Sequence, residues 1–280
     1  MRPTPAKVNL LLKVGASRPQ DNRHEIHTLF LPVPQLADEV AVTPNPPGKG
    51  LTMRLCGRSV PGGASVVDNL ACRAVRAFCA EFGLSEDFHV DLAKRIPVSA
   101  GLGGGSSDAA AALLEMRDLT GQPGSVDGLR PLAVRLGADV AFFLNPVPSL
   151  ATGIGEILTP VEISADYELV IAYPGCPSPV AWAYQHCRSS GDLPPPGWPP
   201  AQAQLSTVED MAQLAWNDLG FALEAKMPLL AMLREALCQN GALTALVSGS
   251  GSSVFGLARA GQGEAIRACL RKAFPSVEAF

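Results

Sequence analysis

The feature that most constrains this chain is a glycine-rich stretch that runs directly into an alanine-rich segment. Four glycines and three polar residues precede four alanines and two leucines, in the order Gly101, Leu102, Gly103, Gly104, Gly105, Ser106, Ser107, Asp108 and residues 109–114. Glycines lack Cβ atoms, so their backbone can bend sharply and approach a ligand closely. Serine and aspartate are typical N-cap residues, and alanine and leucine favour helices. The pattern predicts a tight loop that ends at the N-terminus of a helix over residues 107–114.

The N-terminus of a helix suits a phosphate group, because its first N–H groups have no internal partner and carry a partial positive charge. The alternative is a tight turn before a core helix, but three consecutive glycines and two serines contribute little to packing. Lys94 and Arg95, just upstream, either complement phosphate charge or form a solvated pair at a strand end. The loop is not a Walker A motif, since no Lys-Ser or Lys-Thr follows the glycines, and no strand–GxGxxG–helix unit opens the chain.

Composition limits the class of protein. The chain has 280 residues, of which 47% are hydrophobic and 17% charged, which supplies a core for one large domain or two smaller ones. The formal net charge of −4 argues against a general nucleic-acid-binding protein, which needs a basic surface. No apolar run is as long as a membrane span, and Lys7 and Asn9 interrupt the apolar core that a signal peptide would need. We therefore expect a cytoplasmic protein that binds neither nucleic acid nor a membrane.

The cysteines and histidines do not form a metal-site pattern. The seven cysteines are an odd number, and no pair has the short spacing of metal ligands. Cys72 and Cys79 lie one heptad apart on a predicted helix, so we expect them to face the core as buried thiols. His24 and His27 are three apart on a strand and would face opposite sides, which argues against joint metal ligation.

Hydrophobic periodicity and turn residues predict a mixture of strands and helices. In the first part we expect strands at residues 5–14, 38–60 (with a turn at 44–50) and 88–93, a polar turn entering a strand at 19–29, and a helix capped by Asp68 or Asn69 that ends at Gly83. In the second part we expect helices at 126–136, 228–240 and 263–274, strands at 150–158, 168–174, 245–247 and 254–257, and a proline-rich surface loop at 191–200. Ser206 and Glu209 have the spacing of a capping box, which predicts a helix to about residue 219.

Several polar positions in apolar surroundings have two interpretations each. Lys7 and Asn9 project from the same face of the first strand, which is either a solvated edge or a functional face. Asp139 opens an apolar run, as a helix N-cap, as a carboxylate in a dry site, or as both. The second glycine-rich loop, at residues 248–253, is interpreted as an ordinary hairpin turn unless another motif supports it.

Motifs that lie far apart in the chain occur in the order found in one family. They are Pro5-Ala-Lys-Val-Asn-Leu10, His24-x-x-x-Thr-Leu-Phe30, Gly101-Leu-Gly-Gly-Gly-Ser-Ser-Asp-Ala109, Gly137-Ala-Asp-Val140, Gly153-Ile-Gly-Glu156, Asn217-Asp-Leu219 and Ser248-Gly-Ser-Gly-Ser-Ser-Val-Phe255. Over nearly the whole chain this set resembles the galactokinase–homoserine kinase–mevalonate kinase (GHMP) superfamily. Within it, the set is most similar to the kinases of the non-mevalonate isoprenoid pathway that act on a cytidine diphosphate-linked methylerythritol. One glycine loop would be a weak signal, whereas the ordered set is specific.

The resemblance implies an α+β fold with two domains: an N-terminal ATP-binding α+β domain over residues 1–158 and a C-terminal ferredoxin-like α/β domain over residues 159–280. It implies an ATP-dependent kinase that uses Mg²⁺ and phosphorylates the 2-hydroxyl of the methylerythritol moiety. The partner would be this small molecule, and the protein would be a monomer or a homodimer. The alternatives are a kinase of the same superfamily for homoserine or mevalonate, and a nucleotide-binding protein without catalysis. Retention of Lys7 and Asp139 argues against the last.

The resemblance also assigns roles to residues. Lys7 and Asp139 match the catalytic lysine and aspartate, which would stabilise the moving phosphoryl group and accept or orient the hydroxyl proton. The residues at the nucleotide would be Asn69, Lys94, Pro97, Gly101, Leu102, Gly103, Gly104, Gly105, Ser106, Ser107 and Asp108. The residues at the phosphate acceptor would be Asn9, Arg23, His24, Trp182, Tyr184, Gly249 and Gly251. No metal ligand is assigned.

The chain departs from the family pattern at one position of the acceptor site. The family usually has Asp-Gly-Tyr-His before the Thr-Leu-Phe strand, where this chain has Asp-Asn-Arg-His at residues 21–24. The absent tyrosine stacks on the cytosine ring, and the planar guanidinium of Arg23 can stack in its place or pair with a phosphate. His24 matches the residue that hydrogen-bonds the cytosine edge. Trp182 matches the aromatic residue on the other side of the ring, with Tyr184 as the nearby alternative.

Overall fold

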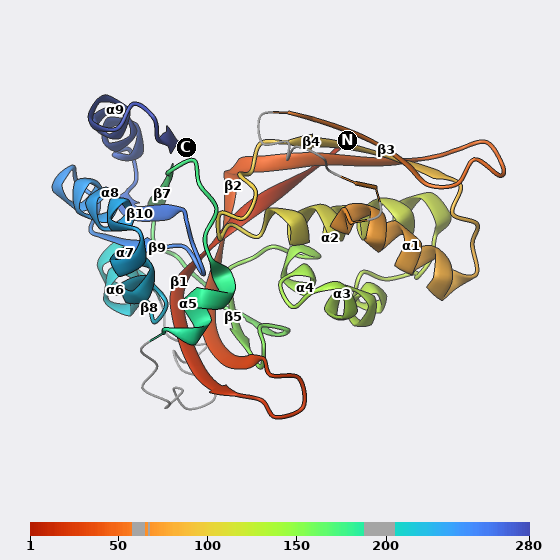
Figure 1. Ribbon diagram of the computed structural model, residues 1–280, viewed down its shortest axis with the longest axis horizontal. Helices are drawn as coiled ribbons and strands as arrows, with labels where there is room; N and C mark the ends of the chain where they lie inside the picture. Colours follow the sequence, from red (N-terminus) through yellow and green to blue (C-terminus); the bar gives the residue numbers. More distant parts are fainter. Residues whose placement is uncertain (58–64, 67, 188–204) are drawn as a thin grey trace. The chain divides into compact units, whose positions relative to one another are not determined.

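The computed structural model describes residues 1–57, 65–66, 68–187 and 205–280, and the proline-rich stretch at 191–200 lies outside them. The chain forms two compact units: unit 1 contains Met1–Ala6, Val33–Val98 and Gly103–Pro146, and unit 2 contains Lys7–Pro32, Ser99–Leu102 and Val147–Phe280. The long strands β1 (Arg2–Ser17) and β2 (His24–Pro44), red to orange in Figure 1, contribute residues to both units. Each unit consists of three separate segments of the chain, so no single point divides the two units. The predicted domain boundary between residues 158 and 159 stays a prediction.

Unit 1 combines strand pairing with a group of helices. The second half of β2 pairs antiparallel with β4 (Phe88–Lys94), and β3 (Thr52–Gly57) pairs parallel with β4. The helices are α1 (Leu70–Phe82), α2 (Gly104–Thr120), α3 (Arg130–Leu136), which follows a short 3-10 turn at Asp127–Leu129, and α4 (Val140–Phe143). α1 lies beside α2 (Figure 1). The buried face of α2 includes the alanines at 109–112, whose small side chains allow close helix packing.

Both ends of α1 confirm the sequence prediction. Asn69 Oδ1 accepts hydrogen bonds from the N–H groups of Ala71 and Cys72, and Gly83 ends the helix in the left-handed conformation with a φ of 66°. Cys72 and Cys79 are buried on this helix, and burial raises the pKa of each thiol to about 11. They are core thiols, as predicted, and stay protonated at neutral pH.

Unit 2 contains strand pairing at β1 and β2 and a separate four-stranded sheet. β2 pairs antiparallel with β5 (Ser149–Thr152), which pairs with β6 (Ile157–Pro160), and β1 pairs parallel with the short β8 (Trp216–Asn217). The separate antiparallel sheet has the order β11 (Glu278–Ala279), β7 (Tyr167–Tyr173), β10 (Val254–Arg259), β9 (Thr244–Val247). Its helices include α8 (Pro228–Gln239) and α9 (Gly263–Ala273), which pack on these strands (Figure 1). This is the ferredoxin-like α/β part that the family resemblance implies.

Three shorter helices of unit 2 are α5 (Val180–Gln185), α6 (Val208–Leu214) and α7 (Gly220–Lys226). The capping box of α6 forms one residue later than predicted: Thr207 Oγ1 accepts from the Asp210 N–H, and the Asp210 carboxylate accepts from the Thr207 N–H. These residues supply the same kind of oxygens as the predicted Ser206 and Glu209, so spacing alone does not select between the pairs. The prediction of a helix to residue 219 is wrong, because the chain leaves α6 after residue 214 to form β8.

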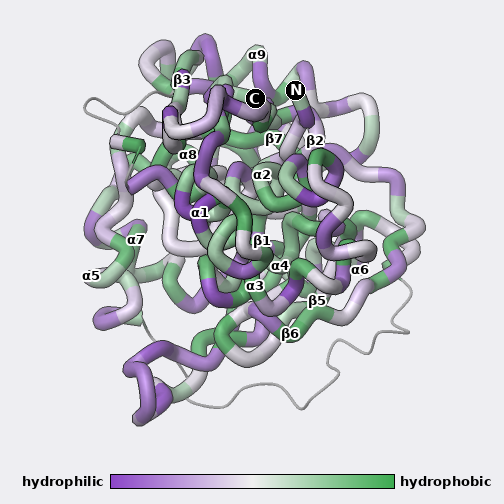
Figure 2. Tube along the Cα trace, turned by 90° about the vertical axis from the view of Figure 1, so that its right-hand side faces the viewer, coloured by the Kyte–Doolittle hydropathy of each residue, from purple (hydrophilic) through white to green (hydrophobic). Residues whose placement is uncertain are grey.

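Hydrophilic residues lie in turns and hydrophobic residues lie in buried strands, as expected for a protein with a buried core. The turn between β1 and β2, at residues 18–23, is coloured hydrophilic in Figure 2, whereas β1 between Val8 and Leu12 is buried throughout. Among the described residues, no helix is both long enough and apolar enough to cross a membrane.

Candidate functional site

The glycine-rich loop enters α2 earlier than predicted. Gly103 precedes the helix with a left-handed φ of 72°, and no side chain of the described residues caps this end. Ser106, Ser107 and Asp108 lie inside the helix, so their predicted role as N-caps is wrong. A Cβ atom on Gly105 would meet nothing within 4 Å. Open space therefore adjoins the first turn, whose N–H groups favour an anion.

Ser107 anchors the start of α2 to β1 within unit 1. Its hydroxyl donates to the carbonyl oxygen of Pro5 at 2.6 Å and lies 2.5 Å from Thr4 Oγ1. Its N–H donates to the carbonyl oxygen of Gly103 at 2.9 Å, and the residue is fully buried. Because both donors point at protein atoms, phosphate contacts in this turn would fall to residues 104–106.

Lys94, at the end of β4, is held by two buried carboxylates in what we call the Asp38–Lys94–Asp108 cluster. Lys94 Nζ lies 2.7 Å from Asp108 Oδ2 and also forms an ion pair with Asp38. The three side chains are only 6%, 5% and 0% exposed for Lys94, Asp108 and Asp38. Asp38 Oδ1 accepts from the N–H groups of residues 95 and 96. A Cβ atom on Gly104 would lie 3.3 Å from Lys94 Nζ, so the cluster adjoins the start of α2.

Burial and charge oppose each other in this cluster. Burial raises the pKa of Asp108 to about 7, against the attraction of the Lys94 cation, and the Asp38 carboxylate adds to the increase. Burial alone would lower the pKa of Lys94, but the Asp108 and Asp38 carboxylates raise it. Lys94 therefore remains a cation at neutral pH, while burial favours the protonated form of Asp108. Asp108 Oδ1 is buried without a hydrogen-bond partner among the described residues.

The other residues predicted at the nucleotide have contacts that stabilise their own segments. Asn69 Oδ1 caps α1, and Pro97 is buried. Leu102 is buried as well, and its carbonyl oxygen accepts from the Lys7 N–H at 2.9 Å. A nucleotide contact for these residues stays a prediction.

Asp139 immediately precedes α4 in unit 1. It is half-buried, and its carboxylate makes no capping hydrogen bond to that helix. Asp139 therefore occupies the predicted N-cap position, but its carboxylate does not cap the helix. A role in catalysis stays a prediction.

A chain of hydrogen bonds crosses the buried face of β1 in unit 2. Lys7 Nζ donates to Asn9 Oδ1 at 2.7 Å, Asn9 Nδ2 donates to Thr28 Oγ1 at 2.8 Å, and Thr28 Oγ1 donates to the carbonyl oxygen of Leu11 at 2.6 Å. Lys7 and Asn9 are 5% and 3% exposed, so the interpretation of a solvated edge is wrong. Lys7 Nζ also lies 5.0 Å from the centre of the Phe30 ring, a distance at which the ring attracts a cation.

The second glycine-rich loop, at residues 248–253, packs against the start of the first. β9 and β10 on either side of it do form an antiparallel pair, as a hairpin would. In addition, Ser248 Oγ donates to the carbonyl oxygen of Gly101 at 3.0 Å, and the Ser253 N–H donates to that of Ala100 at 3.0 Å. The interpretation as an ordinary hairpin turn is therefore incomplete, because this loop is also hydrogen-bonded to the start of the first glycine-rich loop.

Gly249 brings this loop to the polar chain of β1. A Cβ atom on Gly249 would lie 2.9 Å from Asn9 Oδ1 and 3.5 Å from Lys7 Nζ. Gly251 also has a left-handed φ, of 77°, and a Cβ atom there would lie 3.4 Å from Ser178 Oγ. Lys7, Asn9 and Gly249 thus lie together, as expected for residues of one site.

Of the three predicted recognition residues on β2 and α5, two stack on each other. His24 and Tyr184 stack with ring centres 5.6 Å apart and an angle of 22°, and His24 Nδ1 lies 3.0 Å from the carbonyl oxygen of Gly15. The aromatic residue beside His24 is therefore Tyr184, the alternative in the sequence prediction. Arg23, the residue before His24, is exposed.

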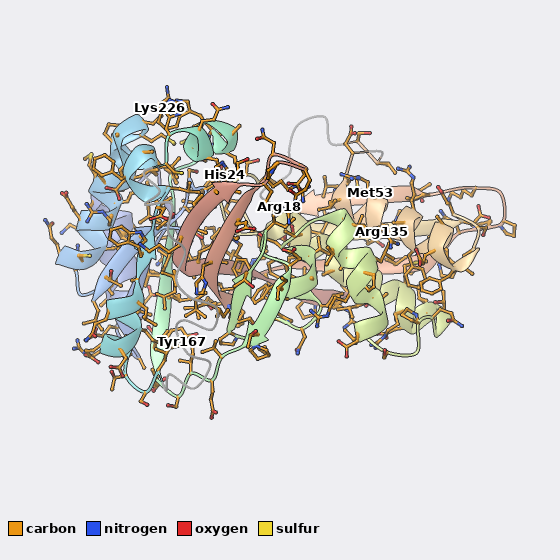
Figure 3. All side chains as sticks on the ribbon, turned by 90° about the horizontal axis from the view of Figure 1, so that it is seen from below. Arg18, His24, Met53, Arg135, Tyr167 and Lys226 are labelled. Atoms are coloured by element: carbon orange, nitrogen blue, oxygen red, sulfur yellow. The ribbon has the colours of Figure 1, made fainter. Side chains whose placement is uncertain are left out.

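Trp182 has different neighbours. Its ring stacks on His186 with centres 4.2 Å apart, and Lys226 Nζ of α7 lies 5.3 Å from its centre. Figure 3 shows Lys226 on α7 and His24 on β2. A role for Trp182 at a flat ligand stays a prediction.

Sequence reasoning missed three residues that organise these clusters. Asp38 stands next to Glu39 in an otherwise apolar strand pattern, and the sequence does not show that Asp38 is the buried member of this pair and Glu39 the exposed one. Thr28 lies inside a recognised motif, but its hydrogen bonds depend on strand pairing. Asn217 lies in a motif to which no role was assigned.

Comparisons with known proteins agree with the sequence motifs. The chain matches the family models described as GHMP kinases N terminal domain, over residues 69–145, and GHMP kinases C terminal, over residues 201–276. It is 39% identical to a 4-diphosphocytidyl-2-C-methyl-D-erythritol kinase of Geobacter metallireducens, with 90% of this chain and 87% of that protein covered. It is 41% identical to a kinase of the same name from Anaeromyxobacter sp., with 90% and 80% covered.

Solved structures extend the agreement to the fold. A crystal structure of 4-(cytidine 5'-diphospho)-2C-methyl-D-erythritol kinase matches with a TM-score of 0.78 at 36% identity, covering 100% of this chain and 97% of that one. Homoserine kinase from Cytophaga hutchinsonii matches with a TM-score of 0.72 at 18% identity, covering 99% and 93%. The second match concerns the fold alone.

Proposed function

The chain belongs to the 4-diphosphocytidyl-2-C-methyl-D-erythritol kinase family of the GHMP kinases, and we propose that it transfers the γ-phosphoryl group of ATP to the 2-hydroxyl of 4-diphosphocytidyl-2-C-methyl-D-erythritol. The products are ADP and the 2-phosphate, in the synthesis of isoprenoid precursors. The observation that carries the proposal within the structure is the buried Lys7–Asn9 pair beside Gly249. A buried ammonium beside the backbone of a glycine loop suits a reaction in which negative charge develops on a phosphoryl group.

The nucleotide phosphates would bind at the start of α2. The N–H groups of residues 104–106 would hold phosphate oxygens, since this helix end has no side-chain cap and open space beside Gly105. Lys94 would support this site through its place beside Gly104. The remaining predicted nucleotide residues are included in the proposal on the family resemblance.

Lys7 and Asp139 would act on the transferred group and on the acceptor. The acceptor oxygen attacks the γ-phosphorus, the bond from that phosphorus to the bridging oxygen of ADP breaks, and the hydroxyl proton leaves the acceptor. Lys7 would stabilise the charge on the moving phosphoryl group, and the Asp139 carboxylate would accept or orient the proton. Asn9 would position the acceptor while fixing the direction of Lys7 Nζ through their hydrogen bond.

Mg²⁺ would arrive as the Mg–ATP complex. Within the described part of the chain, no group of three or more His, Cys, Asp or Glu side chains could hold a metal ion by itself. Mg²⁺ at nucleotide sites is generally held by one or two carboxylates together with phosphates. The ion would supply neutralisation of phosphate charge, and we assign it no protein ligand.

Recognition of the cytosine would use His24 and Tyr184. Their stacked arrangement leaves an imidazole edge for hydrogen bonding and an aromatic ring beside it. Arg23, exposed next to His24, would replace the usual tyrosine by stacking or by pairing with a phosphate. Trp182, Gly249 and Gly251 complete the proposed acceptor site.

The proposal is tested by measuring ADP release with the cytidyl substrate, homoserine and mevalonate under matched conditions. We expect turnover with the cytidyl compound alone, and a product whose phosphorus signal couples to the methylerythritol 2-position. Turnover of homoserine or mevalonate without turnover of the cytidyl compound would refute it. ATP binding without turnover of any of the three would point to a nucleotide-binding protein.

A further inference from the structure

The Asn217-Asp-Leu219 motif has no role in the proposed chemistry, yet the structure places it between β1 and the second glycine-rich loop. β8 pairs parallel with β1, with Leu11 opposite Trp216 and Leu12 opposite Asn217. Asn217 is only 8% exposed. A buried amide side chain must find hydrogen-bond partners, so its contacts indicate what it does.

The Asn217 amide holds the backbone on both sides of the loop entrance. Its Nδ2 donates to the carbonyl oxygens of Val247 and Gly249, at 2.8 Å each, and its Oδ1 accepts from the Leu219 N–H at 2.9 Å. All three partners are backbone groups: the two carbonyl oxygens can only accept a hydrogen bond, and the N–H group can only donate one. This fixes the orientation of the amide, because a flipped side chain would lose all three bonds.

The carbonyl that Asn217 holds belongs to the glycine beside the proposed catalytic lysine. Gly249 has a left-handed φ of 53°, and its missing Cβ would lie 2.9 Å from Asn9 Oδ1 and 3.5 Å from Lys7 Nζ. Such close approach leaves little tolerance for a shift of the loop. The position of Gly249 relative to Lys7 and Asn9 thus depends on what fixes the Gly249 carbonyl.

The neighbouring Asp218 has a separate task. Its carboxylate accepts from the Val14 N–H at 2.8 Å and from Trp216 Nε1 at 2.5 Å, and Lys13 Nζ lies 3.8 Å away. These contacts attach β8 to β1 and do not involve the loop. Asp218 therefore provides the support from which Asn217 reaches the loop.

We infer that Asn217 is a positioning residue for phosphoryl transfer: by holding the carbonyl oxygens of Val247 and Gly249, it keeps Gly249 against the Lys7–Asn9 pair. The inference rests on the proposed function, in which Lys7 acts on the transferred group. It makes Asn217 a determinant of the reaction rate although its side chain bonds to the backbone of Val247, Gly249 and Leu219 rather than to Lys7 or Asn9. A displacement of about 1 Å at a reacting centre can lower a rate by about 100-fold.

The test replaces Asn217 by aspartate, which has the same shape but no N–H donors. Two carbonyl oxygens would then face a carboxylate oxygen, and the loop would move away from it. We expect Asn217→Asp to lower kcat by about 10- to 100-fold while KM for ATP stays within about twofold of the wild-type value. A steady-state assay of ADP release, run well below the melting temperature of each variant, separates kcat from KM.

Asn45 offers a matched control in unit 1. Its Nδ2 also donates to two backbone carbonyl oxygens, of Gly50 and Phe88, at 2.9 and 2.8 Å, and to Thr52 Oγ1 at 2.9 Å. Asn45→Asp therefore imposes a similar repulsion, at a half-buried position, on a turn that has no part in the proposed site. We expect it to lower the melting temperature and leave kcat unchanged. A kcat for Asn217→Asp equal to that of Asn45→Asp would overturn the inference.

Two further variants keep the outcome decisive. If Asn217→Asp does not fold, Asn217→Ser, which retains one donor, should lower kcat by about tenfold, and a wild-type kcat in Asn217→Ser would overturn the inference. Lys7→Met tests the proposed role of Lys7 separately: a wild-type kcat in Lys7→Met would refute that role, whereas the proposed function itself fails if the unchanged protein does not turn over the cytidyl substrate. If Lys7→Met is inactive while Asn217→Asp and Asn217→Ser are fully active, only the role of Asn217 fails.

Discussion

Substitution of Gly101 by alanine tests whether the two glycine-rich loops depend on each other. Gly101 has a left-handed φ of 77°, and a Cβ atom there would lie 2.1 Å from the carbonyl oxygen of Ser248 and 2.9 Å from the Gly251 nitrogen. Real Cβ atoms essentially never approach within 3.0 Å of another heavy atom, so the loops would have to separate by about 0.9 Å, the difference between 3.0 and 2.1 Å. No flexible side chain can absorb this overlap, because both atoms belong to the backbone.

The magnitude follows from two contributions. The left-handed conformation costs a residue with a Cβ atom about 1–2 kcal/mol. Separation of the loops also weakens the hydrogen bonds from Ser248 Oγ to Gly101 and from the Ser253 N–H to Ala100, each of which contributes about 1 kcal/mol. Gly101→Ala should therefore lower the free energy of unfolding by about 3–4 kcal/mol and the melting temperature by about 10 °C.

Gly105→Ala is the matched control, because it adds the same methyl group four residues later. A Cβ atom on Gly105 would meet nothing within 4 Å, and the residue lies inside α2. Alanine favours a helix over glycine, and because Gly105 lies in the first turn of α2, this variant should gain at most about 0.5–1 kcal/mol, the value for a helix interior. Thermal unfolding followed by circular dichroism compares the two variants. Equal melting temperatures would refute the dependence of one loop on the other.

The remaining predictions concern charge and recognition. Asp139→Asn should lower kcat by about 100-fold or more with little change in KM for ATP, and steady-state kinetics with near-wild-type kcat would contradict a role in proton transfer. Burial raises the pKa of Asp108 to about 7 from its ordinary 3.8, so the folded state holds this proton where the unfolded chain releases it. The free energy of unfolding should then fall as pH rises from about 4 to 7, and Asp108→Asn should remove that fall. Urea denaturation at pH 5 and 8 measures it, and an equal fall in both proteins would exclude Asp108 as its source. Arg23→Ala should chiefly raise KM for the cytidyl substrate, and an effect confined to KM for ATP would place Arg23 elsewhere. Tyr184→Ala should raise the same KM through loss of the ring beside His24; an unchanged value would favour Trp182 as the stacking residue.

The parts of the fold that depend on local chemistry could be predicted from the sequence. Asn69 and Gly83 end α1 as predicted, because capping oxygens and left-handed glycines act within one turn of the chain. The second glycine-rich loop also lies between two strands as predicted. The start of α2 was predicted too late. Serine and aspartate are favourable N-caps, which suggested that the helix begins after them, but the left-handed backbone at Gly103 lets the helix begin at residue 104.

The side-chain clusters of the candidate site could not be predicted from the sequence, because they join residues that only the fold brings together. Asp38 meets Lys94 only because β2 and β4 pair in the register that places Glu39 opposite Ala93. Tyr184, and not Trp182, stacks on His24, although both aromatic residues lie on the same short helix. Residues two apart on a helix, such as Trp182 and Tyr184, point in directions about 200° apart. Which of the two rings faces His24 therefore depends on how α5 packs. No pattern within α5 contains that information.

Buried Lys94 shows why a charge in the sequence does not by itself identify an anion site. Lys94 lies just before the glycine-rich loop, where the sequence left open whether its cation complements phosphate or is solvated at a strand end. Its burial excludes the solvated alternative. With all three groups ionised, however, the Asp38–Lys94–Asp108 cluster carries a formal charge of −1, from one cation and two carboxylates. Protonation of Asp108 brings that charge only to zero. Lys94 therefore fixes α2 to β4, and in the proposed site attraction of phosphate to this end of α2 would fall to its backbone N–H groups and the helix dipole.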